Sequence, residues 1–321
     1  MAETLLSVRD LKVRFRGREE TVRAVDGVSF DLEAGRTLGI VGESGSGKSV
    51  TGLALLGLVP PPGEIAGGEI RFEGRDLAKL KSSALREIRG SRIAMIFQDP
   101  MTSLNPFLTV AAQIMEATRR HLGHSRSEAF EHAVKMLDMV GIPTAGARAG
   151  DYPHQFSGGM RQRVMIAMAL ACNPRLLIAD EPTTALDVTI QAQILDLMRD
   201  LRSKTGASMI LITHDLAVVA GIADHVLVMY AGRILESAPA AELFRNPQNP
   251  YTRALLGCTP DPSHRGARLD TIPGLPPTAA RPDANACPFS NRCPEVIDRC
   301  RREFPPYHTV GENHASLCWV R

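Results

Sequence analysis

The chain has 321 residues, of which 44% are hydrophobic and 22% are charged, and its formal net charge is +2. This composition excludes a wholly disordered chain, and the near-neutral charge argues against a protein that coats nucleic acid, so no nucleic-acid partner is expected. The longest apolar runs, such as Val164–Cys172, are too short for the roughly twenty residues of a membrane span, and no secretory signal is evident. We therefore expect a protein of the cytoplasm, whose thiols stay reduced.

Residues 1–250 alternate short apolar segments with helical patterns, which is typical of a parallel sheet covered by helices. The first 35 residues and 68–72 alternate like antiparallel strands, whereas 99–158 shows only helical patterns. Buried strands are predicted over 36–41, 92–97, 176–180, 209–213 and 226–230, and helices over 49–58, 127–140, 159–171 and 187–201. The predicted fold is α/β, with an antiparallel β subdomain and a helical subdomain at about 99–158 inserted into the core.

The last part of the chain has a different composition. Residues 250–321 hold eleven of the 22 prolines, and neither a helical nor a strand period persists there. A segment with so little apolar patterning needs a staple or a partner surface to become ordered. The sequence therefore predicts a main domain over 1–250 and a proline-rich C-terminal extension over 251–321.

Gly42–Ser49 reads Gly-Glu-Ser-Gly-Ser-Gly-Lys-Ser, follows a predicted strand and opens a predicted helix, which is the context of a phosphate loop. Backbone N–H groups of such a loop and the helix N-terminus attract a polyphosphate. Lys48 is expected to reach the β and γ phosphates, and Ser49 to ligate Mg²⁺. The residues expected to bind the nucleotide here are Gly42, Ser44, Gly45, Ser46, Gly47, Lys48, Ser49 and Val50.

Two later segments complement this loop. The predicted strand 176–180 ends in two carboxylates, of which Asp180 is expected to hold Mg²⁺ and Glu181 to polarise an attacking water. Ser157-Gly158-Gly159 opens an apolar helix, either as a second anion-binding turn or as an ordinary helix cap.

These segments, together with Gln98, Ala185–Asp187 and Thr213–Asp215, follow the motif order of an ABC transporter ATPase subunit, which the chain resembles over residues 1 to about 255. The resemblance implies a P-loop NTPase core and two subunits stacked head to tail around two ATP molecules. Each ATP would contact the phosphate loop of one chain and the Ser157-Gly-Gly turn of the other.

The resemblance also implies roles for single residues. Glu181 would be the general base, while Gln98 would sense Mg²⁺ and the attacking water. His214 would contact the γ phosphate, and Asp187 would lie at the seam of the dimer. Phe15 is the candidate for stacking on adenine.

Cys287, Cys293, Cys300 and Cys318 are separated by five, six and seventeen residues, without the cysteine pairs two apart that zinc ribbons show. On ligand type, four thiols suit a zinc ion and an iron–sulfur cubane equally. Asn249–Thr252, Ile272–Pro277 and the cysteine spacing resemble the C-terminal extension of dipeptide and oligopeptide import ATPases. That resemblance implies a [4Fe–4S] cluster, with zinc as the alternative.

The predicted function is the ATP-hydrolysing motor of a dipeptide or oligopeptide importer, bound peripherally at the cytoplasmic face of the membrane, with ATP and Mg²⁺ as cofactors. The implied partners are two transmembrane permease subunits, a second ATPase subunit that is a copy or a sister chain, and indirectly an extracytoplasmic binding protein. The alternatives are the ATPase of a nickel or opine importer and a soluble ABC ATPase outside transport.

Overall fold

The computed structural model describes residues 3–18, 20–184, 186–258, 271–276 and 285–320. Ala185 and Pro277, which belong to two of the motifs above, lie outside these residues. The chain forms two compact units, a first unit of Met1–Lys79 with Leu211–Arg321 and a second unit of Leu80–Ile210. In the described part, no helix is long and apolar enough to cross a membrane.

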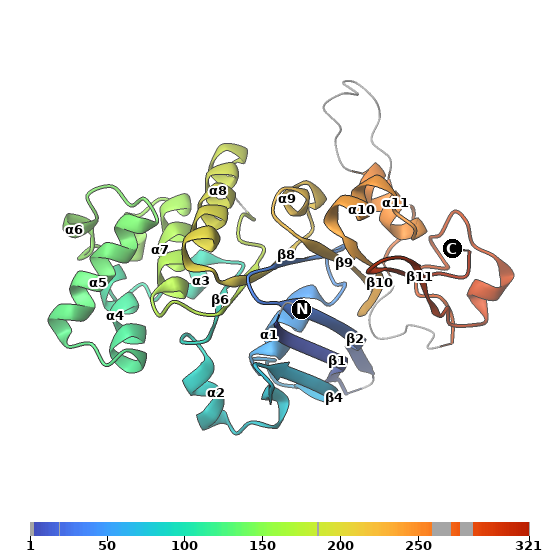
Figure 1. Ribbon diagram of the computed structural model, residues 1–321, viewed down its shortest axis with the longest axis horizontal. Helices are drawn as coiled ribbons and strands as arrows, with labels where there is room; N and C mark the ends of the chain where they lie inside the picture. The colour runs from blue at the N-terminus through green and yellow to red at the C-terminus, as the bar shows by residue number, and fades with distance from the viewer. Residues whose placement is uncertain (1–2, 19, 185, 259–270, 277–284, 321) are drawn as a thin grey trace. The chain divides into compact units, whose positions relative to one another are not determined.

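The first unit contains the predicted antiparallel sheet, with strand order β2-β1-β4-β5; Figure 1 shows β2, β1 and β4 side by side. Its strands are β1 (Thr4–Arg16), β2 (Thr21–Glu33), β4 (Gly63–Phe72) and β5 (Arg75–Asp76). Leu6 and Val8 of β1 are fully buried on one face of the strand, because successive side chains of a strand point to opposite faces; after the register shift between Val8 and Leu11, the buried positions continue with Leu11 and Val13.

The first unit also contains a second group of paired strands, and the phosphate loop follows one of them, β3. Its strands are β3 (Thr37–Val41), β9 (His225–Tyr230), β10 (Arg233–Pro239), β11 (Tyr307–Gly311) and β12 (His314–Leu317). β3 is buried along its whole length and runs parallel to β9, whereas β10 pairs antiparallel with both β9 and β12. The helices of this unit are α1 (Lys48–Leu55), α9 (Leu216–Ala220), α10 (Ala240–Arg245), α11 (Pro250–Gly257), η1 (Leu77–Lys79) and η3 (Asp298–Arg301).

The second unit is mostly helical, as predicted for its middle part. It holds the parallel strands β6 (Ile93–Ile96) and β7 (Leu176–Asp180), and β8 (Ser208–Thr213) begins in this unit and ends in the first. Its helices are α2 (Ser82–Ile88), α3 (Pro100–Ser103), α4 (Val110–His121), α5 (Arg126–Met139), α6 (Ala145–Arg148), η2 (Pro153–Gln155), α7 (Gly158–Leu170) and α8 (Val188–Thr205). Helix α5 begins at a capping box, in which Ser125 and Glu128 bond each other's backbone N–H groups.

The structure differs from the sequence analysis at two places. The helix expected to reach residue 58 ends at Leu55, because the chain turns at Gly57, whose φ is 60°. The extension shows no persistent helical or strand period in its sequence, yet it contains α11, β11 and β12. Strand β12 pairs with β10 through Glu236 and Ser316, so its strand conformation comes from a partner distant in sequence rather than from its own pattern.

Candidate functional site

The phosphate loop joins β3 to α1 in the first unit. The Lys48 side chain lies inside the loop, where its Nζ donates to the carbonyl oxygens of Gly42 at 2.7 Å and Glu43 at 3.0 Å. The hydroxyl of Ser46 is buried and has no hydrogen-bond partner among the described groups. A buried ammonium and a buried hydroxyl within a glycine-rich turn match the chemistry of a polyphosphate site.

Glycine is required at two positions of this loop. Gly42 and Gly47 have φ values of 152° and 99°, which L side chains rarely adopt. A Cβ atom would lie 2.1 Å from the carbonyl oxygen of Met229 at Gly42, and 2.3 Å from that of Ala24 at Gly47. The motif glycines therefore fix both the shape of the loop and its close approach to neighbouring backbone.

The remaining predicted nucleotide residues of the first unit occupy different surroundings. Ser44 and Gly45 are exposed at the tip of the loop, whereas Ser49 and Val50 are half-buried in the first turn of α1. The half-buried Phe15 lies on β1, paired with Gly63 of β4. His214 is exposed immediately after β8, one residue before Asp215 caps α9.

Three predicted residues of the second unit gather at the ends of β6 and β7. Asp180 is the last residue of β7 and is 5% exposed. Glu181 follows it in a left-handed conformation, with φ of 46°. One Glu181 carboxylate oxygen, Oε2, accepts hydrogen bonds from Gln98 Nε2 at 2.9 Å and from the Thr184 hydroxyl at 2.8 Å. This arrangement holds one carboxylate in a fixed orientation beside a second, buried one.

Sequence reasoning missed Thr184. The available signal was its place three residues after Glu181 in a Pro-Thr-Thr segment, because a hydroxyl at that distance can reach back to the carboxylate. Its donation to Oε2 makes Thr184 a positioning residue for Glu181.

The Ser157-Gly-Gly turn forms the N-terminus of α7 in the second unit. Ser157 is the N-cap residue of α7, and its hydroxyl accepts a hydrogen bond from Met160 N at 3.4 Å. The turn therefore does act as a helix cap. Ser157 and Gly158 are nevertheless exposed, and a Cβ atom at Gly159 would lie 2.7 Å from Ile190 of α8. Asp187 caps α8 by accepting from Ile190 N at 3.0 Å and is also exposed.

The four predicted cysteines line one small cavity in the first unit, together with Phe289 and Leu317. Burial raises the pKa of Cys287 to about 12, with the other three thiols adding to the shift, and burial also raises the pKa of Cys293. In the part of the chain that the structure describes, no group of three or more His, Cys, Asp or Glu side chains is arranged to hold a metal ion. The four thiols thus line one cavity, but their arrangement does not support the expected iron–sulfur site.

Comparison with known proteins covers both parts of the sequence. Residues 25–184 match the family described as ABC transporter, and residues 235–300 match the family described as oligopeptide/dipeptide transporter, C-terminal region. A dipeptide transport ATP-binding protein of Bacillus subtilis is 52% identical, over 99% of this chain and 95% of its own. An oligopeptide transport ATP-binding protein of Salmonella typhimurium is 51% identical, over 99% of this chain and 94% of its own.

Solved structures give the same result for the fold. A dimeric ATP-binding cassette bound to ADP and phosphate matches with a TM-score of 0.66 and 28% identity, over 73% of this chain and 98% of that one. A subunit of a Clostridium perfringens ABC transporter complex matches with a TM-score of 0.64 and 26% identity, over 76% and 92% of the two chains. The predicted cassette fold, with its α/β P-loop core, antiparallel sheet and helical subdomain, is confirmed.

Proposed function

The chain belongs to the ATP-binding subunits of peptide ABC transporters, and from this membership we propose that it is the ATP-hydrolysing motor subunit of a dipeptide or oligopeptide importer. The observation that carries the peptide assignment is the extent of the similarity. It includes the C-terminal region typical of oligopeptide and dipeptide transporters as well as the cassette, and the curated relatives are covered almost from end to end.

ATP and Mg²⁺ are the cofactors that this family uses, and the residues present suit both. Lys48 and the N–H groups of the loop would hold the phosphates, with Phe15 as the candidate for the adenine. Ser49, Asp180 and Gln98 would supply oxygen ligands of the kind that Mg²⁺ prefers. The metal would neutralise charge on the β and γ phosphates.

Hydrolysis requires a base for the attacking water, and Glu181 would accept the proton of that water. Hydrogen bonds from Gln98 and Thr184 to the same oxygen, Oε2, orient the carboxylate. His214 would contact the γ phosphate. Such orientation of a reacting group before the chemical step lowers the barrier because little reorganisation remains.

The exposed Ser157-Gly-Gly turn would complete the ATP site of a second ATPase subunit, either a copy of this chain or a sister chain, with Asp187 at the seam. ATP binding would close the pair, and hydrolysis would reopen it because the joining γ phosphate is lost. Closure would act on two membrane permease subunits at the cytoplasmic face, with an extracytoplasmic binding protein delivering the peptide.

The function can be tested by measuring peptide uptake in cells from which the gene for this chain has been deleted. Reintroducing the native chain should restore uptake of a labelled dipeptide or oligopeptide, whereas Lys48→Ala should not, because the loop loses its only described buried cation. Lys204→Ala, at an exposed lysine of α8, serves as the control. Uptake that survives Lys48→Ala, or that proves specific for nickel or opines, would contradict the proposal.

We also propose that the cysteine cavity binds a [4Fe–4S] cluster with a structural or regulatory role. Support comes from the donor set, four soft thiols lining one cavity. Protein purified without oxygen should be brown, with broad absorption at about 400 nm. Cys293→Ser should abolish this absorption, whereas the control Cys258→Ser should preserve it. A colourless protein with stoichiometric zinc would contradict the cluster.

A further inference from the structure

An arginine of the C-terminal extension bonds the phosphate loop directly. The Arg292 guanidinium holds the Glu43 carboxylate with two parallel contacts, Nη1 to Oε2 at 2.6 Å and Nη2 to Oε1 at 3.0 Å. The Arg292 side chain is only 4% exposed and that of Glu43 is 25% exposed. A buried two-point pair of this kind fixes orientation, unlike an exposed ion pair that contributes little.

Arg292 is itself anchored within the first unit. Its Nε donates to the carbonyl oxygen of Pro273 at 2.9 Å, and its Nη2 donates to that of Ile272 at 3.3 Å. Its Nη1 donates to the Tyr230 hydroxyl at 3.3 Å. A guanidinium is protonated at any pH at which proteins are folded, so Arg292 stays charged. These hydrogen bonds hold the Arg292 side chain in one position, from which it contacts Glu43.

Tyr251 of α11 holds the backbone of the same loop residue. The Glu43 N–H donates to the Tyr251 hydroxyl at 3.0 Å. The Tyr251 ring is fully buried and packs against the rings of Tyr230 and Phe289, with centroid distances of 4.6 and 5.2 Å. Phe289 precedes Arg292 by three residues, so one aromatic cluster supports both groups that bond Glu43.

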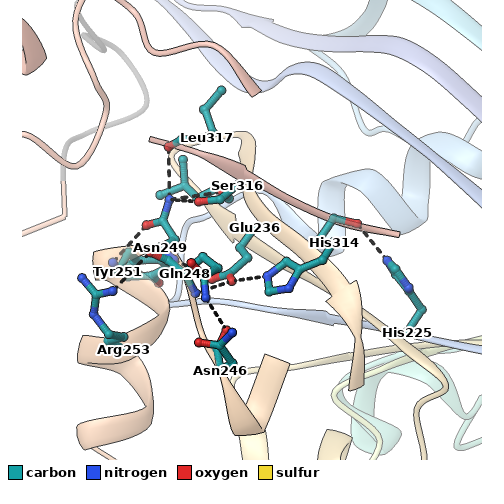
Figure 2. A network of polar contacts seen from close by, with 12 residues as sticks. His225, Glu236, Asn246, Gln248, Asn249, Tyr251, Arg253, His314, Ser316 and Leu317 are labelled. Atoms are coloured by element: carbon teal, nitrogen blue, oxygen red, sulfur yellow. Dashed lines mark hydrogen bonds and ion pairs between the residues drawn. The ribbon is translucent and has the colours of Figure 1, made fainter. Parts of the chain in front are cut away.

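Figure 2 shows why Tyr251 has a fixed position. Asn249 accepts from Tyr251 N at 3.0 Å and donates through Nδ2 to the carbonyl oxygen of Leu317 at 3.1 Å. The fully buried Glu236 carboxylate accepts from Asn249 N at 3.0 Å and bonds His314 Nε2 at 2.8 Å. The start of α11 is therefore joined to β10 and β12.

Glu43 connects these restraints to the nucleotide loop. Its carbonyl oxygen accepts from Lys48 Nζ at 3.0 Å and from Ser46 N at 3.2 Å. Its side chain and its N–H are bonded by Arg292 and Tyr251. A displacement of Glu43 would therefore change the position of the phosphate-binding lysine.

We propose that Arg292 is a positioning residue for ATP binding, which acts by fixing Glu43 and neutralising its carboxylate beside the phosphate loop. The inference rests on the proposed ATP-binding function. Without the guanidinium, the loop loses part of its preorganisation, and an unpaired carboxylate repels the incoming polyphosphate. The extension is thus part of the nucleotide site and not only an appendage to it.

Titration of the purified full-length chain with a fluorescent ATP analogue tests this role. Arg292→Met should raise the Kd about tenfold, whereas Arg292→Lys, which keeps the charge, should recover part of the affinity. Turnover at saturating ATP in the assembled transporter should change by less than about twofold, because Arg292 touches no reacting group. Arg299→Met is the matched control, since Arg299 of the same extension stacks on Trp319 and pairs with Glu303.

The decisive comparison repeats Arg292→Met in a Glu43→Gln background. If Arg292 acts through the Glu43 carboxylate, the substitution should change the Kd there by less than about twofold. An equal loss of affinity in both backgrounds would show a general supporting role and overturn the inference, as would unchanged affinity in the single variant. Failure of the native chain to bind the analogue would instead contradict the proposed ATP-binding function.

Discussion

Replacing Glu181 by glutamine should lower ATP turnover by about 10²–10⁴-fold, the range for loss of a general base, while ATP binding persists. Glutamine has the same length and still accepts hydrogen bonds through its amide oxygen, so Gln98 and Thr184 can continue to hold it. It cannot take a proton from water. Phosphate release at saturating ATP, measured alongside ATP affinity in the same preparation, separates the two effects.

The control for this variant is Glu131→Gln, which removes a carboxylate from the exposed face of α5. It should leave turnover unchanged. Hydrolysis near the native rate in Glu181→Gln would contradict the assignment of the base. Loss of ATP binding in that variant would mean that Glu181 supports the site rather than the chemical step.

Replacing Ser157 by arginine should reduce ATP turnover of the assembled transporter by about 10²-fold, comparable to the loss of one donor to a developing charge. Ser157 and Gly158 are exposed, so a bulky side chain fits without disturbing the core of the second unit. It would occupy the space that the second subunit's ATP needs. ATP binding to the isolated chain should be retained, because the phosphate loop is untouched.

Ser125→Arg is a matched control, because Ser125 caps α5 as Ser157 caps α7, and both side chains are exposed. Loss of a cap costs on the order of 1 kcal/mol in either helix. If both variants lose turnover equally, the effect of Ser157→Arg is one of helix stability. A loss confined to Ser157→Arg supports a site shared between subunits.

Local patterns were sufficient for the elements that carry the motifs. Strand β7 has the predicted bounds of 176–180, and α5 begins one residue before the predicted start. Both are marked by strong local signals, a continuous apolar run ending in carboxylates and a helical period preceded by a capping serine. The phosphate loop could also be predicted from the sequence. Its conformation requires glycine at fixed positions, because the φ values and the close backbone approaches there exclude other residues, and these glycines form the motif.

The long-range contacts that hold the site in place could not be predicted from local sequence patterns. Arg292 and Glu43 are 249 positions apart, and neither lies in a pattern that indicates the other. Strand β12 was missed because it consists of only four residues and depends on pairing with β10. Long-range pairings of this kind are set by packing of the whole unit and not by the residues alone.

The most direct test of a shared ATP site is vanadate-dependent photocleavage in the assembled transporter. Vanadate takes the place of the departing γ phosphate, and ultraviolet light then cuts the backbone beside it. If the phosphate is held from both sides, this chain should be cut within Gly42–Ser49 and also at Ser157–Gly158, in each case only when ATP and Mg²⁺ are present. Cutting at the phosphate loop alone would contradict a site built from two subunits.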